Sequence, residues 1–525
     1  MTLSLERRAA LWGDRTAIVD ASADRRVGYA DLESEADAMA RRLAALGVGP
    51  GDPVAVLSRN RVETLALFFA ARRLGAVFAP ISYRLTPATV EEPLETVDPA
   101  AVVHEAAQRD LVRELPDDLT HTFEELGRSD GADYERVDPG PEDSLAYIHA
   151  KDEADRPAVG EDPGRNRPGE SLNEDPPTAP RVVDLPARAV EWNCVTATAA
   201  WGLGRGDCAP AMLPFSDADG LLRLALPLLY VGGRVVVLRA FDPDDALAAV
   251  DEEGATALFA GATEYRELVE SEAFASTDFG SVGWAGSRSA LPADVRETLA
   301  REAPVVRTYG RAETGPNNLY CPPESGGGDV DGAESDPADP DRVGRPFPDC
   351  EVRLADEGGE PVPEGEVGEL RFRGPVTPRG YLRGDADGED GDGGDDRDTD
   401  PFPEWVPTGD LAVRQGGDYY LLGPAREGFE SASARVHPRR AERALEARDG
   451  VTAVGVVPAE QGALAAFVGD ADPGELRDDL AAELPDEVAV RELTRVESLP
   501  RRATGELDRA ALRRDLSGEE RIDKE

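Results

Sequence analysis

The sequence predicts an α/β protein in which a large N-terminal region of doubly wound sheets with a β subdomain precedes a small mobile α+β C-terminal domain. Three observations favour this class: apolar strand patterns alternate with helical patterns up to residue 259, turn-linked extended segments begin near residue 345, and a shorter mixed pattern follows Gly423. We expect the large region over 1–423 with its β subdomain at about 345–423, the C-terminal domain over 424–515 and a tail over 516–525.

The first doubly wound half is predicted from residues 31–104. Short apolar strands alternate there with amphipathic helices, which is typical of right-handed βαβ units and of a parallel sheet covered on both faces. The expected elements are a helix at 31–47, a strand at 53–57, a helix at 64–75, a strand at 77–81, a further helix, and a strand at 100–103.

A second doubly wound half is predicted after residue 186. A strand at 234–238 (RVVVL) precedes a helix at 241–254, in which Asp242 can cap the N-terminus and Pro243 fits the first turn. The next strand is expected at 255–259.

Extended segments joined by Gly and Pro turns indicate antiparallel strands in the β subdomain, at 350–356, 368–374 and 418–423. In the C-terminal domain we expect strands at 451–457 and 463–468 and a helix at 474–484. Three segments of low complexity, 151–180, 324–342 and 384–400, read as solvated loops. A calcium loop at 384–400 is an alternative, although the spacing of its acidic residues does not match the usual pattern.

The chain is strongly acidic, with 105 Asp or Glu against 57 Lys or Arg and a formal net charge of −48. Its only lysines are Lys151 and Lys524. This balance argues against nucleic acid and anionic membrane surfaces as partners, because both are bound through Lys and Arg. Since 40% of the residues are hydrophobic and gather in regular segments, the chain is folded. The composition fits a protein adapted to a high-salt cytoplasm, and a base-composition bias towards Arg is the alternative.

Cysteines and histidines, four of each, are scattered through the chain, which argues against a structural zinc site and against a disulfide framework. The N-terminus has no apolar core of signal-peptide length, and Arg72 and Arg73 interrupt the best apolar stretch. We therefore expect a cytoplasmic protein with no membrane insertion.

Phrases along most of the chain resemble, in order and spacing, those of the adenylate-forming superfamily, in its branch of AMP-forming acyl-CoA synthetases and acid–CoA ligases. They are ISYRLTP (81–87), PRVVDLPARAVEWN (180–193), LPFSDADGL (213–221), YGRAETGPNN (309–318), WVPTGDLA (405–412), RVHPRRAE (435–442) and LPRRATGELDRAALR (499–513). The resemblance implies a two-step reaction. A carboxylate attacks the α-phosphate of ATP to give an acyl-adenylate and pyrophosphate, and the thiol of CoA then displaces AMP.

The same resemblance assigns roles to individual residues. Glu313 matches the acidic residue that holds Mg²⁺, Tyr309 and Gly310 match the adenine and acyl pocket, and Asp410 matches the carboxylate that binds the ribose of ATP or AMP. Arg181 falls at the lysine position of the phosphate loop, Glu427 at the hinge position and Asp217 in the acyl-pocket phrase.

Five departures from the family pattern concentrate in the parts that handle ATP. The Ser-Gly-Thr-Thr-Gly run of the phosphate loop is absent, and Asp152, Glu153 and Asp155 stand in that region. Glu506 replaces the C-terminal catalytic lysine, which reverses the charge that would bridge the carboxylate and the α-phosphate. The remaining departures are Ser216-Asp217 in the acyl-pocket phrase, Pro424 at the ribose-contacting arginine and Ala312 before the magnesium glutamate.

Three hypotheses follow from these matches and departures. The first is a working acid–CoA ligase that uses a small-molecule carboxylic acid, ATP, Mg²⁺ and CoA. The second is a non-catalytic or half-reaction homologue that binds acyl-adenylate, AMP or acyl-CoA as a sensor or partner subunit. The third is a structural or interaction protein with no small ligand. The sequence indicates neither the acyl group nor the oligomeric state.

Overall fold

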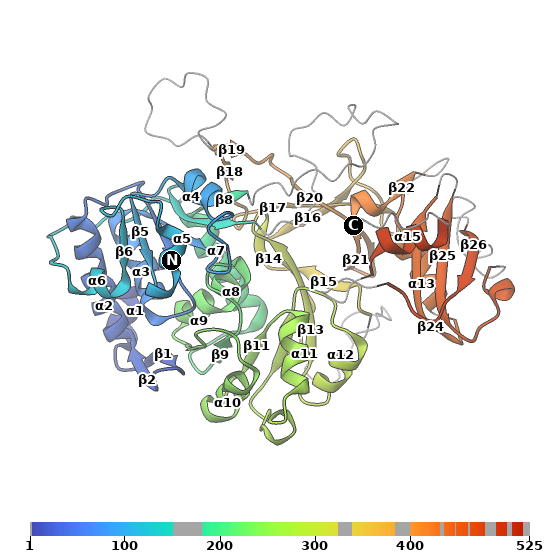
Figure 1. Ribbon diagram of the computed structural model, residues 1–525, viewed down its shortest axis with the longest axis horizontal. Coiled ribbons are helices and arrows are strands. Elements are labelled where there is room, and N and C mark those ends of the chain that lie inside the picture. Colours follow the sequence, from blue (N-terminus) through green and yellow to red (C-terminus); the bar gives the residue numbers. More distant parts are fainter. Residues whose placement is uncertain are drawn as a thin grey trace. The chain divides into compact units, whose positions relative to one another are not determined.

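The computed structural model describes residues 3–150, 181–323, 339–383, 399–430, 435–446, 448–459, 462–477, 490–500 and 507–517 (Figure 1). The chain divides into two compact units, which are described separately. The first unit comprises 1–332, 343–352 and 372–406, and the second comprises 333–342, 353–371 and 407–525. The domain boundary expected at residues 423 and 424 remains a prediction.

An eight-stranded sheet dominates the N-terminal part of the first unit, in the order β19-β18-β8-β7-β4-β3-β5-β6. The strands from β7 to β6 are parallel, as predicted, whereas β8, β18 and β19 add an antiparallel edge that the sequence did not indicate. Their bounds are β3 Pro53–Leu57, β4 Val77–Ile81, β5 Ala101–His104, β6 Thr120–Thr122, β7 Ser144–His149, β8 Val182–Pro186, β18 Gly380–Leu382 and β19 Thr399–Pro401.

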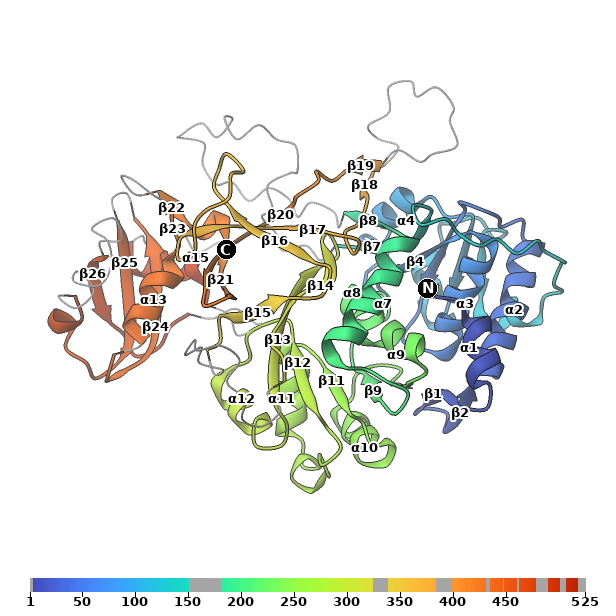
Figure 2. The ribbon, with the colours of Figure 1, turned by 180° about the vertical axis from the view of Figure 1, so that it is seen from behind.

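Helices α2 (Tyr29–Ala45) and α3 (Val62–Leu74) pack together beside this sheet (Figure 2). Nearly every residue of α3 is buried, including Arg72 and Arg73. Arg72 pairs with Glu191 at 3.1 Å and Arg73 with Asp37 at 3.4 Å, so both buried guanidinium groups have carboxylate partners. None of the helices in the described ranges combines the length and apolar character needed to cross a bilayer.

Two further sets of strands complete the first unit. One is a four-stranded sheet in the order β2-β1-β10-β9, and the other runs β11-β12-β13-β14-β15. A shared apolar core that includes Val236 and Leu258 joins β10 to β11. The bounds are β1 Thr16–Asp20, β2 Arg25–Gly28, β9 Cys208–Ala211, β10 Arg234–Val237, β11 Ala257–Phe259, β12 Trp284–Ser287, β13 Val305–Arg311, β14 Gly315–Tyr320 and β15 Arg342–Pro346.

The predicted cap of α10 (Pro243–Glu253) is confirmed, because the Asp242 carboxylate accepts hydrogen bonds from the backbone N–H groups of Asp244 and Asp245. The other helices of this unit are α1 Leu5–Trp12, α4 Glu91–Val97, α5 Arg109–Val112, α6 Phe123–Arg128, α7 Ala187–Trp201, α8 Ala218–Gly220, α9 Leu226–Val231, α11 Ala262–Glu270 and α12 Ala293–Leu299. One turn of π-helix at Leu221–Ala225 connects α8 to α9.

The second unit contains the strands β21-β20-β17-β16, in that order, a two-stranded β22-β23 pair and a three-stranded sheet β24-β25-β26. The β20–β21 pair is antiparallel, as expected for the β subdomain. Helices α13 (Pro438–Glu446) and α15 (Arg509–Ser517) pack on β24. The bounds are β16 Glu351–Ala355, β17 Val367–Arg373, β20 Val406–Gln415, β21 Asp418–Pro424, β22 Phe429–Glu430, β23 Arg435–Val436, β24 Val451–Pro458, β25 Ala463–Gly469 and β26 Val490–Arg495.

Several sequence expectations fall outside the described residues. The segment 151–180 lies wholly outside them, as do most of 324–342 and 384–400 and the second half of the helix expected at 474–484.

Candidate functional site

The hairpin of β13 and β14 carries Tyr309, Gly310 and Glu313. Gly310 is required by its surroundings, since a Cβ atom there would lie 1.9 Å from the carbonyl oxygen of Pro316. In the turn, the Thr314 hydroxyl donates to Oδ1 of Asn318 at 2.5 Å. The hairpin therefore holds Glu313 on a closely packed, hydrogen-bonded turn.

Glu313 is 5% exposed and accepts a hydrogen bond from the hydroxyl of Tyr381 at 3.2 Å. Tyr381 also contacts Arg181, whose guanidinium carbon lies 5.0 Å from the centroid of the Tyr381 ring. Arg181 itself is exposed at the start of β8. Tyr381 thus brings the predicted magnesium carboxylate and the predicted phosphate-loop cation together, through a strand that the sequence analysis did not associate with the site.

The Tyr309 side chain is buried and packs against a nearby strand. Its side chain is 4% exposed and stacks on Phe372, with ring centroids 5.7 Å apart and an interplanar angle of 24°. This stack fixes the strand that leads into Glu313.

Asp217, the residue expected in the acyl pocket, caps α8 by accepting a hydrogen bond from the backbone N–H of Asp219 at 3.1 Å. The cap places Asp219 against Arg223, a fully buried arginine whose Nη2 donates to Oδ1 of Asp219 at 2.5 Å. Arg288 contacts the other carboxylate oxygen of Asp219 at 3.1 Å. Two guanidinium groups therefore contact one buried carboxylate within the acyl-pocket phrase.

Arg223 has further partners on the same hairpin that carries Glu313. It donates to Oγ1 of Thr308 at 3.0 Å and to Oδ1 of Asn317 at 3.4 Å. Its guanidinium carbon also lies 4.8 Å from the centroid of the Phe259 ring. Burial lowers the pKa of Arg223, and the Asp219 carboxylate opposes that change. The pairing of Asp219 with Arg223 was not predicted from the sequence, although an Asp and an Arg four residues apart inside an apolar segment are a usable signal.

In the second unit, Asp410 is 5% exposed on β20. The two preceding residues of the strand are held by hydrogen bonds to β17, from the Thr408 hydroxyl to the Leu370 carbonyl at 2.8 Å and from the Gly409 N–H to Oε1 of Glu369 at 3.0 Å. The predicted ribose-binding carboxylate is therefore held by its neighbours in a defined position within its own unit.

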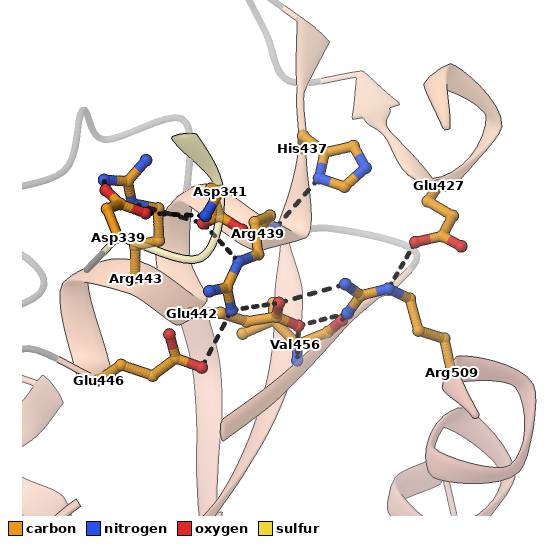
Figure 3. A network of polar contacts seen from close by, with 10 residues as sticks. All are labelled: Asp339, Asp341, Glu427, His437, Arg439, Glu442, Arg443, Glu446, Val456 and Arg509. Atoms are coloured by element: carbon orange, nitrogen blue, oxygen red, sulfur yellow. Dashed lines mark hydrogen bonds and ion pairs between the residues drawn. The ribbon is translucent and has the colours of Figure 1, made fainter. Parts of the chain in front are cut away.

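Glu427, the predicted hinge residue, lies in a single 3₁₀ turn (Ala425–Glu427) and is joined to Arg509 of α15 (Figure 3). Nε of Arg509 donates to Oε2 of Glu427 at 2.6 Å, and Nη1 donates to the Val456 carbonyl at 2.8 Å. Arg509 also pairs with Glu442, whose side chain is 2% exposed. Although burial disfavours its charge, Glu442 and Glu427 together raise the pKa of Arg509.

The same network extends to a second arginine on α13. Nε of Arg439 pairs with Asp341 at 2.8 Å, and Arg439 also contacts Glu442 and Glu446 (Figure 3). Arg509 lies in the phrase LPRRATGELDRAALR (499–513), but the sequence predicted no role for it. Glu506, three residues earlier, lies outside the described residues.

No cluster of three or more potential metal-ligating His, Cys, Asp or Glu side chains occurs in the part of the chain that the structure describes. The four cysteines are buried as free thiols.

Comparisons with known proteins show the family to which the chain belongs. The model of the AMP-binding enzyme family matches residues 5–163 and 179–382. A feruloyl-CoA synthase from an Amycolatopsis species is 28% identical over 438 residues, covering 82% of this chain and 80% of that protein. An indoleacetate–CoA ligase from Aromatoleum aromaticum is 27% identical and covers 86% of this chain and 84% of its own.

Among solved structures, apo MatB from Rhodopseudomonas palustris has the same fold, with a TM-score of 0.75, 22% sequence identity and 99% of each chain covered. The family match spans most of the chain and includes Arg181, Glu313 and Tyr381. This chain is therefore a member of the AMP-binding enzyme family, with acid–CoA ligases among its relatives.

Proposed function

We propose that the protein is an AMP-forming acid–CoA ligase. A small-molecule carboxylic acid and ATP would give an acyl-adenylate and pyrophosphate, and CoA would then displace AMP to give the acyl-CoA. The observation that carries the proposal is that the Tyr381 hydroxyl hydrogen-bonds the Glu313 carboxylate while the Arg181 guanidinium lies over the Tyr381 ring. Family membership and the names of the feruloyl-CoA and indoleacetate relatives support the substrate class.

Mg²⁺ fits the Glu313 position on chemical grounds. Protein sites usually hold Mg²⁺ through one or two carboxylates together with substrate phosphates, and the other ligands are water. The Tyr381 hydroxyl occupies one oxygen of Glu313 and orients the carboxylate, which is how a supporting residue prepares a metal ligand. The ion would supply positive charge for the phosphate oxygens, and Arg181 would add a second cation close by.

A second candidate function is a half-reaction or binding homologue, and the replaced phosphate-binding residues favour it. Asp152, Glu153 and Asp155 bring negative charge to the region of the phosphate loop, and Glu506 removes the cation expected during adenylation. Transfer of a supplied acyl-adenylate to CoA releases AMP and needs no pyrophosphate contacts. For either candidate, the acidic composition supports activity in a salt-rich cytoplasm.

Pyrophosphate exchange into ATP separates the two functions. The assay uses the full chain in molar KCl with Mg²⁺ and a panel of carboxylic acids that includes ferulate and indoleacetate. For the ligase we expect acid-dependent exchange that falls about 100-fold or more in Glu313→Gln, whereas the exposed control Glu302→Gln keeps the full rate. Tyr381→Phe should raise the Mg²⁺ concentration needed for half-maximal exchange about 10-fold, because it removes the hydrogen bond that orients Glu313.

Absence of acid-dependent exchange would reject the ligase. In that case the half-reaction homologue predicts that a synthetic acyl-adenylate is converted to acyl-CoA, and that Glu506→Lys restores part of the exchange while Glu497→Lys does not. A protein that shows neither exchange nor thioester formation, and whose thermal unfolding is not shifted by AMP, would be neither candidate.

A further inference from the structure

A solvent-open pocket of about 480 Å³ lies in the first unit between α1, the residues after α7 and the end of α9. Its apolar walls include Leu11, Trp12 and Tyr230, and its charged groups include Arg7 and Arg205. None of these residues belongs to the site around Glu313 or to the acyl-pocket phrase. The volume lies within the range of pockets that bind small organic molecules.

The walls of the pocket are held in place by contacts within the fold. Arg8, at the back, donates from Nε to the carbonyl of Tyr230 at 2.9 Å, and its guanidinium carbon lies 4.3 Å from the centroid of the Tyr230 ring. The Trp12 ring meets Tyr29 edge-on at 5.8 Å, and the Tyr29 hydroxyl donates to the Gly233 carbonyl at 2.8 Å. A ligand would therefore meet a preformed surface, which reduces the entropy that binding must overcome.

Two arginines supply the exposed positive charge of the pocket. Arg7 and Arg205 both line it, both are exposed, and among the described residues neither forms an ion pair with a carboxylate. Two uncommitted guanidinium groups therefore flank the same apolar pocket.

The apolar part of the pocket includes the most exposed large hydrophobic side chain of the described ranges. Leu11 is 72% exposed, compared with 37% for Leu46 and 38% for Trp192. It lines the pocket together with Trp12 and Tyr230, so it belongs to a shared apolar surface. Apolar walls and a pair of cations together select a molecule with an apolar body and one anionic end.

We propose that this pocket binds an amphipathic monocarboxylate. The apolar body lies against Leu11, Trp12 and Tyr230, and the carboxylate lies between Arg7 and Arg205, each of which can donate two parallel N–H groups to it. The site is separate from the one that would activate a carboxylate, so the inference does not depend on the proposed ligase activity.

Binding of octanoate to the full chain tests the proposal, measured by equilibrium dialysis with labelled octanoate and by the fluorescence of Trp12. We expect the double variant Arg7→Gln/Arg205→Gln to bind at least about 10-fold more weakly, because both carboxylate partners are lost. The control Arg301→Gln, which also removes an exposed arginine, should bind octanoate as the unmodified chain does. Octan-1-ol, which lacks the charge, should bind at least about 10-fold more weakly than octanoate.

Trp12→Phe locates the site. The fluorescence response to octanoate should disappear in this variant, while dialysis still detects binding. The Arg7→Gln/Arg205→Gln and Trp12→Phe variants alter only pocket-lining side chains, so the far-ultraviolet circular dichroism spectrum should stay unchanged. Octanoate that fails to bind, that binds the double variant as tightly as the unmodified chain, or that gives the same fluorescence response without Trp12 would overturn the proposal.

Discussion

The buried contact between Arg223 and Asp219 should make a large contribution to the stability of the first unit. The change to test is Arg223→Met, which keeps much of the side-chain volume and removes the charge. Arg223 is 1% exposed and donates to Asp219 at 2.5 and 2.8 Å. Removing one partner of a buried pair costs about 3–5 kcal/mol, because the other partner stays buried without its counter-charge.

The remaining contacts place the cost within that range. Asp219 keeps Arg288 at 3.1 Å in the variant, so its carboxylate retains one cation and the loss should lie near about 3 kcal/mol. Asp219→Leu leaves the fully buried Arg223 without its carboxylate and should cost closer to about 5 kcal/mol. When both are replaced, no buried charge lacks a partner, so the double variant should be more stable than the sum of the single losses predicts, by about 2 kcal/mol or more.

Urea unfolding provides the measurement. Trp201 stacks on Trp284 with ring centroids 4.3 Å apart, so near-ultraviolet circular dichroism reports on packing inside the same unit. Arg266→Met is the matched control, since Arg266 also has an acidic partner four residues away but is 43% exposed. That change should cost less than about 1 kcal/mol. Strictly additive single losses, or a loss for Arg223→Met as small as the control, would refute the reasoning.

Three further predictions concern other buried contacts. Burial lowers the pKa of His149 to about 4 from its usual 6.5, so the folded state resists protonation and the protein loses stability as the pH falls from 6.5 to 4. Urea unfolding should show a loss of about 3 kcal/mol over this range, and the loss should be absent in His149→Leu. Arg509→Met should speed amide exchange of Val456 at least about 10-fold, because Arg509 holds the Glu442 carboxylate that accepts a hydrogen bond from the Val456 N–H at 2.8 Å, whereas the exposed control Arg513→Met should not. Gly310→Ala should prevent folding of the hairpin, as the added Cβ would lie 1.9 Å from a backbone oxygen, and a Gly127→Ala chain, which meets no atom within 4 Å, should fold normally.

The sequence predicted best where a local pattern decides the structure. The strands expected at 53–57 and 77–81 coincide with β3 and β4, because each is a fully apolar run between turn residues. The cap at Asp242 also needs only its own neighbours, and it occurs as expected. Of the candidate site, the positions of Tyr309, Gly310 and Glu313 on one hairpin follow from a single phrase of the sequence.

Contacts between distant segments could not be predicted in the same way. Tyr381 hydrogen-bonds Glu313, which lies 68 residues earlier in the sequence, and it does so from β18, a strand that pairs antiparallel with β8. A three-residue strand such as β18 is too short to show a periodic pattern in the sequence. Asp184 and Arg379 meet through the same pairing, with Nη2 of Arg379 2.6 Å from Oδ2 of Asp184. The antiparallel edge of the eight-stranded sheet is therefore the part of the fold that assembles the candidate site, and it is the part that sequence periodicity does not reveal.

The acidic composition takes on a more specific meaning once the buried acids are considered. Glu105 is 2% exposed and lies 3.1 Å from Arg59 and 2.5 Å from Arg239, and Glu442 is held by Arg509. Despite its net charge of −48, the chain places guanidinium groups at these deeply buried carboxylates. Cations are therefore available to this chain where a buried carboxylate needs one, so composition alone does not account for the predicted Glu506 replacement. The pyrophosphate-exchange assay, rather than composition, decides between a ligase and a half-reaction homologue.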